Sequence, residues 1–170
     1  MTDRPSASPI GLRTGCALAA GALAADQLTK AIVLEQASRL AEGMPVLPGF
    51  ALVFVWNPGI SFGAFGGVGP WALSALALAV TAAMAVWMWR ERSGLVVAAL
   101  GLIIGGALGN VLDRLRHGAV VDFLDLSVGT YHWPAFNLAD TAITVGAILM
   151  IWDTFAVRQP ARPTSCNEND

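Results

Sequence analysis

Long apolar stretches alternate with short polar ones along this 170-residue chain. Residues 43–89 carry no formal charge, and neither do residues 93–112. Roughly 20 helical residues cross a bilayer core of about 30 Å, so the pattern predicts an all-α membrane protein. We place its four membrane-spanning helices at residues 11–34, 70–89, 94–112 and 137–157.

The first and last predicted helices each depend on an acidic residue. Their charge-free cores, residues 14–25 and 141–152, are too short to cross a bilayer alone. Each helix becomes long enough only if Asp26 or Asp140 is accepted within the membrane or at its edge. Because ionisable groups are costly there, both residues are candidates for function.

Residues 35–69 do not continue the helical pattern, because proline and glycine interrupt them repeatedly. Their central piece, residues 50–56, is rich in β-branched and aromatic side chains, which favours one or two short strands. We expect this piece to lie on the outer face of the membrane. Its apolar surface suits contact with lipid or a lipid-bearing substrate, and it suits packing over the helix ends equally well.

The basic residues give the orientation, because arginine and lysine favour the cytoplasmic side. With both tails inside, six basic residues are cytoplasmic and only four lie toward the outside: Lys30, Arg39, Arg114 and Arg116. We therefore predict cytoplasmic termini and one membrane domain over residues 11–157. Residues 1–10 and 158–170 are rich in proline, serine and charge, which predicts disordered tails.

In this topology the unusual polar residues all fall on the outer side. They lie late in the first helix, end the third, begin the fourth, or lie in the intervening loops: Asp26, Asn57, Asn110, Asp113, Asp122, Asn137 and Asp140. Asn110, Asp113 and Arg114 share one face of the third helix with Gly106. Asn137, Asp140 and Thr144 share a face of the fourth. The sequence therefore predicts a polar site between these helices near the outer boundary.

Composition supports a membrane protein and excludes one class of partner. The chain is 55% hydrophobic and 13% charged, against about 25% charged in soluble domains. With a net charge of −2 and no basic cluster, we expect no nucleic-acid binding. Cys16 and Cys166 lie at opposite ends of the chain, and we expect both to be unpaired.

The glycines between residues 101 and 109 predict close helix packing. Gly101, Gly105 and Gly109 are spaced four residues apart, as in the small-xxx-small pattern of membrane helices. A dinucleotide-binding loop is disfavoured, because no strand precedes this segment and Ile104 stands where the motif needs glycine.

Carboxylates are the available catalytic groups. The sequence has no nucleophile elbow, zinc-protease motif or C-x-x-C pair. Asp113, Asp122, Asp125 and Asp140 remain, with Arg114 as the nearest cation. Two carboxylates in one low-dielectric site do not both ionise cheaply, which gives one acid and one base. Such a pair activates water without a metal. We expect no metal site from Asp122, Asp125, His117 and His132, because metal-ligand spacing is missing, and we expect no cofactor.

Four segments carry a resemblance to a known family. They are Asp26-Gln27-x-Thr29-Lys30, Asn57-x-Gly59-x-Ser61-Phe62, the run from Gly105 to Phe123 that contains Asn110-x-x-Asp113-Arg114 and Val120-Val121-Asp122-Phe123, and Pro134-x-Phe136-Asn137-x-Ala139-Asp140. In order and spacing the chain resembles bacterial lipoprotein signal peptidase, or signal peptidase II. The resemblance spans residues 26–140.

The resemblance implies a four-helix inner-membrane aspartic endopeptidase that removes the signal peptide from diacylglyceryl-modified prolipoproteins, with its active site near the periplasmic face. It also implies a small β-platform and a loop on the periplasmic face, and it places the catalytic pair on Asp122 and Asp140. The supporting or substrate-binding positions are Asp26, Asn57, Gly59, Asn110, Asp113, Arg114 and Asn137. The expected partners are prolipoprotein substrates and membrane lipid, and we expect a monomer.

Several assignments stay open at this point. The three asparagines, Asn57, Asn110 and Asn137, suit contacts to the substrate or bridges between helices. Arg114 suits an ion pair with Asp113 or a contact with the substrate. Which catalytic aspartate carries the proton is undetermined. A different function, a small proton-coupled transporter, would use Asp26 and Asp140 as a relay.

Overall fold

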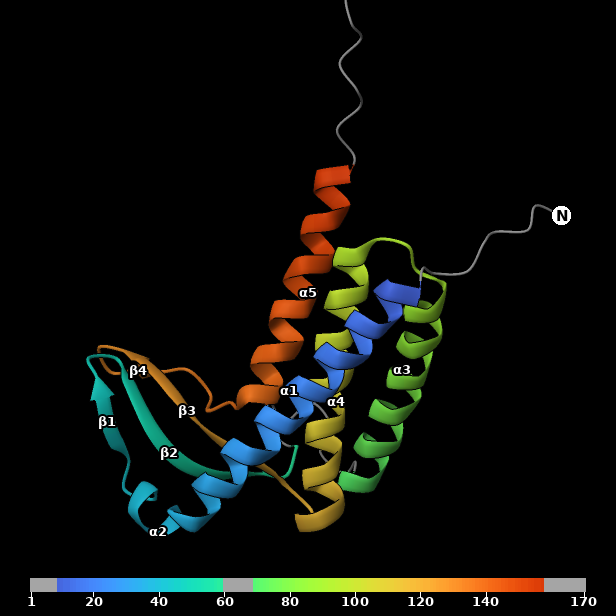
Figure 1. The fold of residues 1–170 in the computed structure, drawn as a ribbon. Helices are drawn as coiled ribbons and strands as arrows, with labels where there is room; N and C mark the ends of the chain where they lie inside the picture. Colours follow the sequence, from blue (N-terminus) through green and yellow to red (C-terminus); the bar gives the residue numbers. More distant parts are fainter. Residues whose placement is uncertain (1–8, 60–68, 158–170) are drawn as a thin grey trace, which may run out of the picture.

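Four long helices and a small antiparallel sheet make up the computed structural model, which describes residues 9–59 and 69–157 (Figure 1). The long helices are α1 (Pro9–Glu35), α3 (Pro70–Arg90), α4 (Gly94–His117) and α5 (Leu138–Val157), and a single turn, α2 (Ala37–Leu40), follows α1. Each long helix contains a segment long and apolar enough to cross a membrane. The prediction of four spanning helices is confirmed. Most of the two predicted tails, and the motif residues Ser61 and Phe62, lie outside the described residues.

The helix ends differ most from the predicted ones at α4. This helix runs to His117, beyond the predicted end at residue 112. The charged Asp113 does not end the helix, because its side chain is buried and paired with Lys30. α4 ends at Gly118, whose φ of 74° is a left-handed conformation that glycine adopts without steric cost. α1 begins at Pro9, slightly earlier than predicted.

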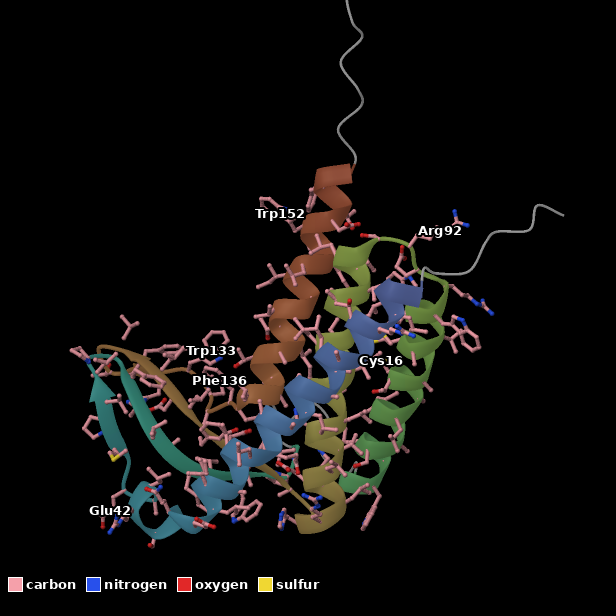
Figure 2. All side chains as sticks on the ribbon, in the orientation of Figure 1. Cys16, Glu42, Arg92, Trp133, Phe136 and Trp152 are labelled. Carbon is pink, nitrogen blue, oxygen red and sulfur yellow. The ribbon has the colours of Figure 1, made fainter. Side chains whose placement is uncertain are left out.

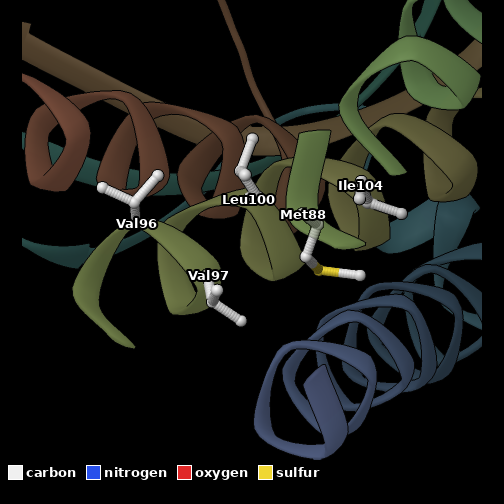
Figure 3. Packing of buried hydrophobic residues seen from close by; sticks show 5 residues of the cluster. All are labelled: Met88, Val96, Val97, Leu100 and Ile104. Carbon is white, nitrogen blue, oxygen red and sulfur yellow. The ribbon is translucent and has the colours of Figure 1, made fainter. Parts of the chain in front are cut away.

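Helix α4 is the central helix of the bundle and packs against α1, α3 and α5. Figure 3 shows the apolar cluster that Met88 of α3 forms with Val96, Val97, Leu100 and Ile104 of α4. Leu100 is fully buried. Because α4 is covered by other helices, its polar end lies inside the protein rather than against lipid.

Glycines bring α4 unusually close to its neighbours. A Cβ atom at Gly105 would meet the backbone oxygen of Ala19 in α1 and lie 2.9 Å from the side chain of Ala22. A Cβ atom at Gly106 would meet the backbone oxygen of Ala139 in α5. The predicted role of these glycines in helix packing is therefore confirmed.

Replacing Gly105 with alanine should destabilise the helix bundle. The added methyl group has no room against α1, and such overpacking typically costs about 1–3 kcal/mol. Thermal unfolding of the purified protein in detergent measures the loss. Gly21→Ala in α1 is the matched control, because a Cβ atom there meets nothing within 4 Å. Equal unfolding temperatures for the two variants would contradict the packing argument.

The sheet has the strand order β1-β2-β3-β4 and is antiparallel throughout. Its strands are β1 (Met44–Leu47), β2 (Phe50–Asn57), β3 (Val120–Val128) and β4 (Tyr131–His132). The strand expected at residues 50–56 is confirmed as β2. The sheet lies beside the end of the bundle opposite the start of α1 and the end of α5 (Figure 1).

One prediction about this region was wrong, because Asp122 lies in strand β3 and not in a loop. Val55 of β2 is its partner in the register. The flanking Val121 and Phe123 are buried against Val33 and Leu40, from α1 and α2. This packing fixes the strand and with it the position of the aspartate.

Apolar side chains of the sheet are divided between the protein and its surface. Val121 and Phe123 pack over the helices, whereas Leu47, Val128 and Tyr131 are exposed. Figure 2 shows Trp133 and Phe136 where the chain passes from the sheet to α5. The sheet therefore packs over the helix ends and also leaves apolar side chains exposed, and the expected contact with lipid or a lipid-bearing substrate stays a prediction.

Candidate active site

The polar residues predicted to converge do so where the sheet meets the bundle. They come from the late part of α1 (Asp26), the end of β2 (Asn57), the late part of α4 (Asn110, Asp113 and Arg114), β3 (Asp122) and the start of α5 (Asn137 and Asp140). Hydrogen bonds connect all of them except Arg114 through side chains. Several are almost completely buried, so the cluster is an interior site.

Asn137 contacts both aspartates. Its side-chain nitrogen donates to Asp122 Oδ1 at 2.7 Å, and its backbone N–H donates to Asp140 Oδ2 at 3.3 Å. Its side-chain oxygen accepts the backbone N–H of Asp140 at 2.9 Å. The last contact caps the first turn of α5 in the manner of a capping box. One residue thus holds the two carboxylates in a common site.

Phe136 explains how Asn137 reaches Asp122. Its backbone oxygen accepts the N–H groups of Phe123 and Leu124, and its own N–H donates to Leu124. These bonds attach the entry to α5 to the edge of β3. These hydrogen bonds bring Asp122 and Asp140 together, although the two residues are 18 positions apart in the sequence.

Two further asparagines each donate to one carboxylate. Asn57 Nδ2 lies 2.8 Å from Asp122 Oδ2, and Asn110 Nδ2 lies 2.8 Å from Asp140 Oδ1. The Asn57 amide is oriented by the N–H of Gly59, which donates to its oxygen at 2.8 Å. Gly59 has φ of 93°, a region that favours glycine. The asparagines therefore act in this structure as bridges and donors to the carboxylates.

A deeper layer of charge lies behind the asparagines. Lys30 Nζ is 2.9 Å from Asp26 Oδ2 and 2.9 Å from Asp113 Oδ2. Gln27 Nε2 donates to Asp113 Oδ1 at 3.0 Å. Sequence reasoning did not select Lys30 or Gln27 as site residues. The available signal was the spacing of Asp26 and Lys30, four residues apart on a helix.

Arg114 was expected to pair with Asp113 or to contact the substrate, and the second role stays a prediction. Asp113 pairs with Lys30, so the expected Asp113–Arg114 ion pair was wrong. Arg114 Nη1 instead donates to the backbone oxygen of Asn110 at 3.4 Å. Among the described residues its buried Nε has no hydrogen-bond partner. The guanidinium therefore retains capacity to bind a ligand beside the carboxylates.

The pKa of Asp122 is raised to about 6, mainly because burial disfavours its charged form. The negative charge of Asp140 acts in the same direction. Hydrogen bonds from Asn57 and Asn137, and the charge of Lys30, act against the rise. A carboxyl group with a pKa near neutrality is suited to proton transfer at physiological pH.

Two cavities adjoin the carboxylates. The larger, of about 490 Å³, is lined by apolar side chains that include Leu126, Trp133, Phe136 and Val145, and it reaches Asn57 and Asp140. The smaller, of about 210 Å³, includes Trp56, Pro134 and Asp122. A ligand with a long apolar part fits the larger cavity and brings its polar part to the aspartates.

The histidines considered as metal ligands contact other residues. His132, whose side chain is exposed, places Nδ1 2.8 Å from Oδ2 of the largely covered Asp125. The ring of His117 packs against that of Trp56, with centroids 5.3 Å apart. No group of three potential metal ligands occurs in residues 9–59 and 69–157.

Comparisons with known proteins find similar sequences and a similar structure. A family model described as signal peptidase (SPase) II matches residues 18–156. A lipoprotein signal peptidase of Rhodopseudomonas palustris (strain TIE-1) is 43% identical over 162 residues, which cover 88% of this chain and 98% of that protein. One of Burkholderia thailandensis is 48% identical over 132 residues, which cover 75% of this chain and 79% of that protein. A solved bacterial membrane enzyme has a TM-score of 0.76 at 27% identity, over 88% of this chain and 92% of that one.

Proposed function

Since the chain belongs to the signal peptidase II family of multi-pass membrane proteases, we propose that it is an aspartic endopeptidase that cleaves diacylglyceryl-modified prolipoproteins before the lipidated cysteine. Asp122 and Asp140 are its catalytic residues. One observation carries the proposal: carboxylates from β3 and α5 both contact Asn137, beside a large apolar cavity.

In the proposed reaction a water molecule lies between the two carboxylates. Asp140 takes a proton from this water as the water oxygen attacks the carbonyl carbon that precedes the cysteine. Asp122 donates its proton to the nitrogen of the breaking C–N bond, so the products are a carboxyl group and a free amine. The pair titrates as a unit, with the active form holding one proton.

The neighbouring polar groups have separate proposed roles. Asn57, Asn110 and Asn137 hold the carboxylates, because their side-chain nitrogens already donate to them. Arg114 binds the substrate carbonyl, for which its unpaired Nε within the described structure is available. A positively charged donor at a developing oxyanion favours the transition state.

The proposed orientation places the site near the periplasmic face. The start of α1, the end of α5 and the turn between α3 and α4 lie at the opposite end of the bundle (Figure 1). That turn carries Arg90 and Arg92, which favour the cytoplasm. No observation favours the proton-relay transporter, because Asp26 is engaged by Lys30 and by the backbone N–H of Ala139.

A reconstituted cleavage assay tests the proposal. The purified chain in lipid vesicles is mixed with a diacylglyceryl-modified prolipoprotein, and the products are identified by mass spectrometry. We expect a released signal peptide and a mature chain that begins with the lipidated cysteine. Cleavage at any other bond, or no cleavage, would contradict the proposal.

The pH dependence of cleavage should report Asp122. Because this carboxyl must keep its proton to act as the acid, kcat/KM should fall as the pH increases through about 6. Asn57→Ala removes a hydrogen bond that favours the ionised form. The inflection should therefore move to higher pH in this variant. Steady-state cleavage rates measured between about pH 4 and about pH 9 give the pH of this inflection.

Asp125→Asn is the control for this assignment. Asp125 lies on the same strand, pairs with His132 and is the other acidic residue of β3. The inflection should stay in place in this variant. An inflection that disappears with Asp125, or that does not respond to Asn57→Ala, would remove Asp122 as its source.

A further inference from the structure

Lys30 is the only lysine in the chain, and it is buried beside the candidate active site. Its exposed fraction is 2%, and it lies in the part of α1 that faces α4. A buried ammonium group is costly unless it is paired and hydrogen-bonded. Replacement by an apolar residue is often neutral or stabilising when the whole ionic group is removed. A role beyond stability therefore requires evidence from its contacts.

The two carboxylates that flank Lys30 bind corresponding points of the backbone. Asp26 accepts a hydrogen bond of 2.9 Å from the backbone N–H of Ala139, which is the residue directly before Asp140. Asp113 accepts a hydrogen bond of 3.1 Å from the backbone N–H of Val121, which is the residue directly before Asp122. The ammonium group joins Asp26 to Asp113 with two contacts of 2.9 Å. Lys30 thereby connects the backbone anchors of both aspartates.

Gly109 makes this arrangement possible on the α4 side. A Cβ atom at this position would meet Asp26 Oδ2, the oxygen that contacts Lys30. The absence of a side chain leaves room for the Asp26 carboxylate against α4. The ion pairs are therefore accommodated by the helix interface.

A third contact of Lys30 sets the direction of a hydrogen bond to Asp140. Its ammonium group donates to Asn110 Oδ1 at 3.1 Å. Because an ammonium group only donates, this contact favours the orientation with the Asn110 oxygen toward Lys30, and Asn137 Nδ2 supports it by donating to the same oxygen at 3.2 Å. The nitrogen is then the atom that faces Asp140, at 2.8 Å. With the opposite orientation, the Asn110 oxygen would face a carboxylate oxygen.

Resting on the proposed function, we infer that Lys30 is a positioning residue for the catalytic pair. Through Asp26 and Asp113 it sets the spacing of the segments that carry Asp140 and Asp122, and through Asn110 it orients the donor to Asp140. Lys30 does not touch the substrate. Its loss should therefore lower kcat and leave KM nearly unchanged.

The variants are built in an Asp26→Asn background. Removing Lys30 alone would leave two buried carboxylates facing each other, which favours misfolding. In the double variant D26N/K30M only Asp113 of the three groups stays charged, so the cluster keeps its original formal charge. The amide introduced by Asp26→Asn retains an oxygen that can accept the N–H of Ala139. The comparison is then between D26N and D26N/K30M, each with and without Asn110→Ala.

We expect D26N/K30M to have a kcat about 10- to 100-fold below that of D26N, as for other groups that orient a reacting residue, with KM changed by less than about 2-fold. The pH inflection assigned to Asp122 should move upward, because the charge of Lys30 lowers that pKa. The loss caused by Lys30→Met should be smaller in the Asn110→Ala background, since the two residues act along one path.

Arg116→Met is the matched control. It removes an exposed positive charge near the same end of α4, where Arg116 contacts Gln27 at 2.8 Å. Its inflection should not move, because solvent and salt screen an exposed charge. If Lys30 were purely structural, the reduction in kcat caused by Lys30→Met would multiply with that caused by Asn110→Ala, and the pH inflection would not move. Either result would overturn the inference.

A measurement without turnover covers the case in which D26N/K30M does not fold. Labelling the protein with ¹⁵N-lysine gives one side-chain ammonium signal in NMR, since the chain has one lysine. In Asn110→Ala this signal should shift and exchange faster with water. An unchanged signal would overturn the inference. If the wild-type chain itself fails to cleave a lipidated prolipoprotein, the proposed function fails, whatever the NMR result.

Discussion

Asp122→Asn and Asp140→Asn should each reduce cleavage of a lipidated prolipoprotein by at least about 10³-fold, within the range of general acid–base catalysis. Asparagine is close in size to aspartate but neither accepts the proton of water nor donates one to the leaving nitrogen. Because the two carboxylates act as a unit, losing either removes the catalytic form. Mass spectrometry of the products in reconstituted vesicles measures the residual rate.

The same variants need a control for folding. Each carboxylate accepts hydrogen bonds from two different residues, Asp122 from Asn57 and Asn137, and Asp140 from Asn110 and Asn137. Asparagine has a single side-chain oxygen, so some rearrangement is expected. Thermal unfolding in detergent should still give a cooperative transition. If a folded variant retains cleavage near the wild-type rate, that aspartate is not part of the catalytic pair.

A prolipoprotein whose cysteine lacks the diacylglyceryl group should be cleaved about 10²-fold more slowly in kcat/KM. The apolar cavity beside Asp140 is large enough for part of an acyl chain. At about 0.8 kcal/mol for each buried CH₂ group, four such groups contribute about 3 kcal/mol. This energy corresponds to roughly a hundredfold effect. Competition between modified and unmodified substrates in one reaction gives the ratio directly.

Val145→Asn provides the matched variant for this experiment. Val145 lines the cavity from α5 and has no contact with either aspartate in the hydrogen-bond network. A polar group there should slow cleavage of the lipidated substrate and leave cleavage of the unmodified one nearly unaffected. The ratio of kcat/KM between the two substrates should therefore decrease. Equal rates for the two substrates with the unchanged protein would contradict recognition of the lipid.

The sequence predicted the helices and the convergence of polar groups because both follow from hydropathy and topology. Charge-free stretches locate the spans, and alternating directions place the ends of α1 and α4 and the start of α5 at the same side. The end of α4 was misplaced because Asp113 was treated as a boundary. Its charge is compensated by Lys30, which is 83 residues away in the sequence. A partner at that distance leaves no local signal.

Strand β3 was missed for a related reason. Residues 120–123 follow a helix directly and contain an aspartate, a residue that is depleted in strands. The strand forms because Val121 and Phe123 pack on α1 and α2 and because β2 supplies a hydrogen-bonding edge. The directions of the asparagine hydrogen bonds likewise depend on Lys30 and on backbone N–H groups that meet only in the folded chain.

The division of the two aspartates between β3 and α5 also has a consequence for biosynthesis. Ribosomes deliver the chain from its N-terminus, and Asp140 belongs to the last helix. A nascent polypeptide with three inserted helices contains Asp122 but neither Asn137 nor Asp140. If the proposed pair is catalytic, hydrolysis becomes possible only after α5 has inserted, so an unfinished molecule does not cleave the proteins around it.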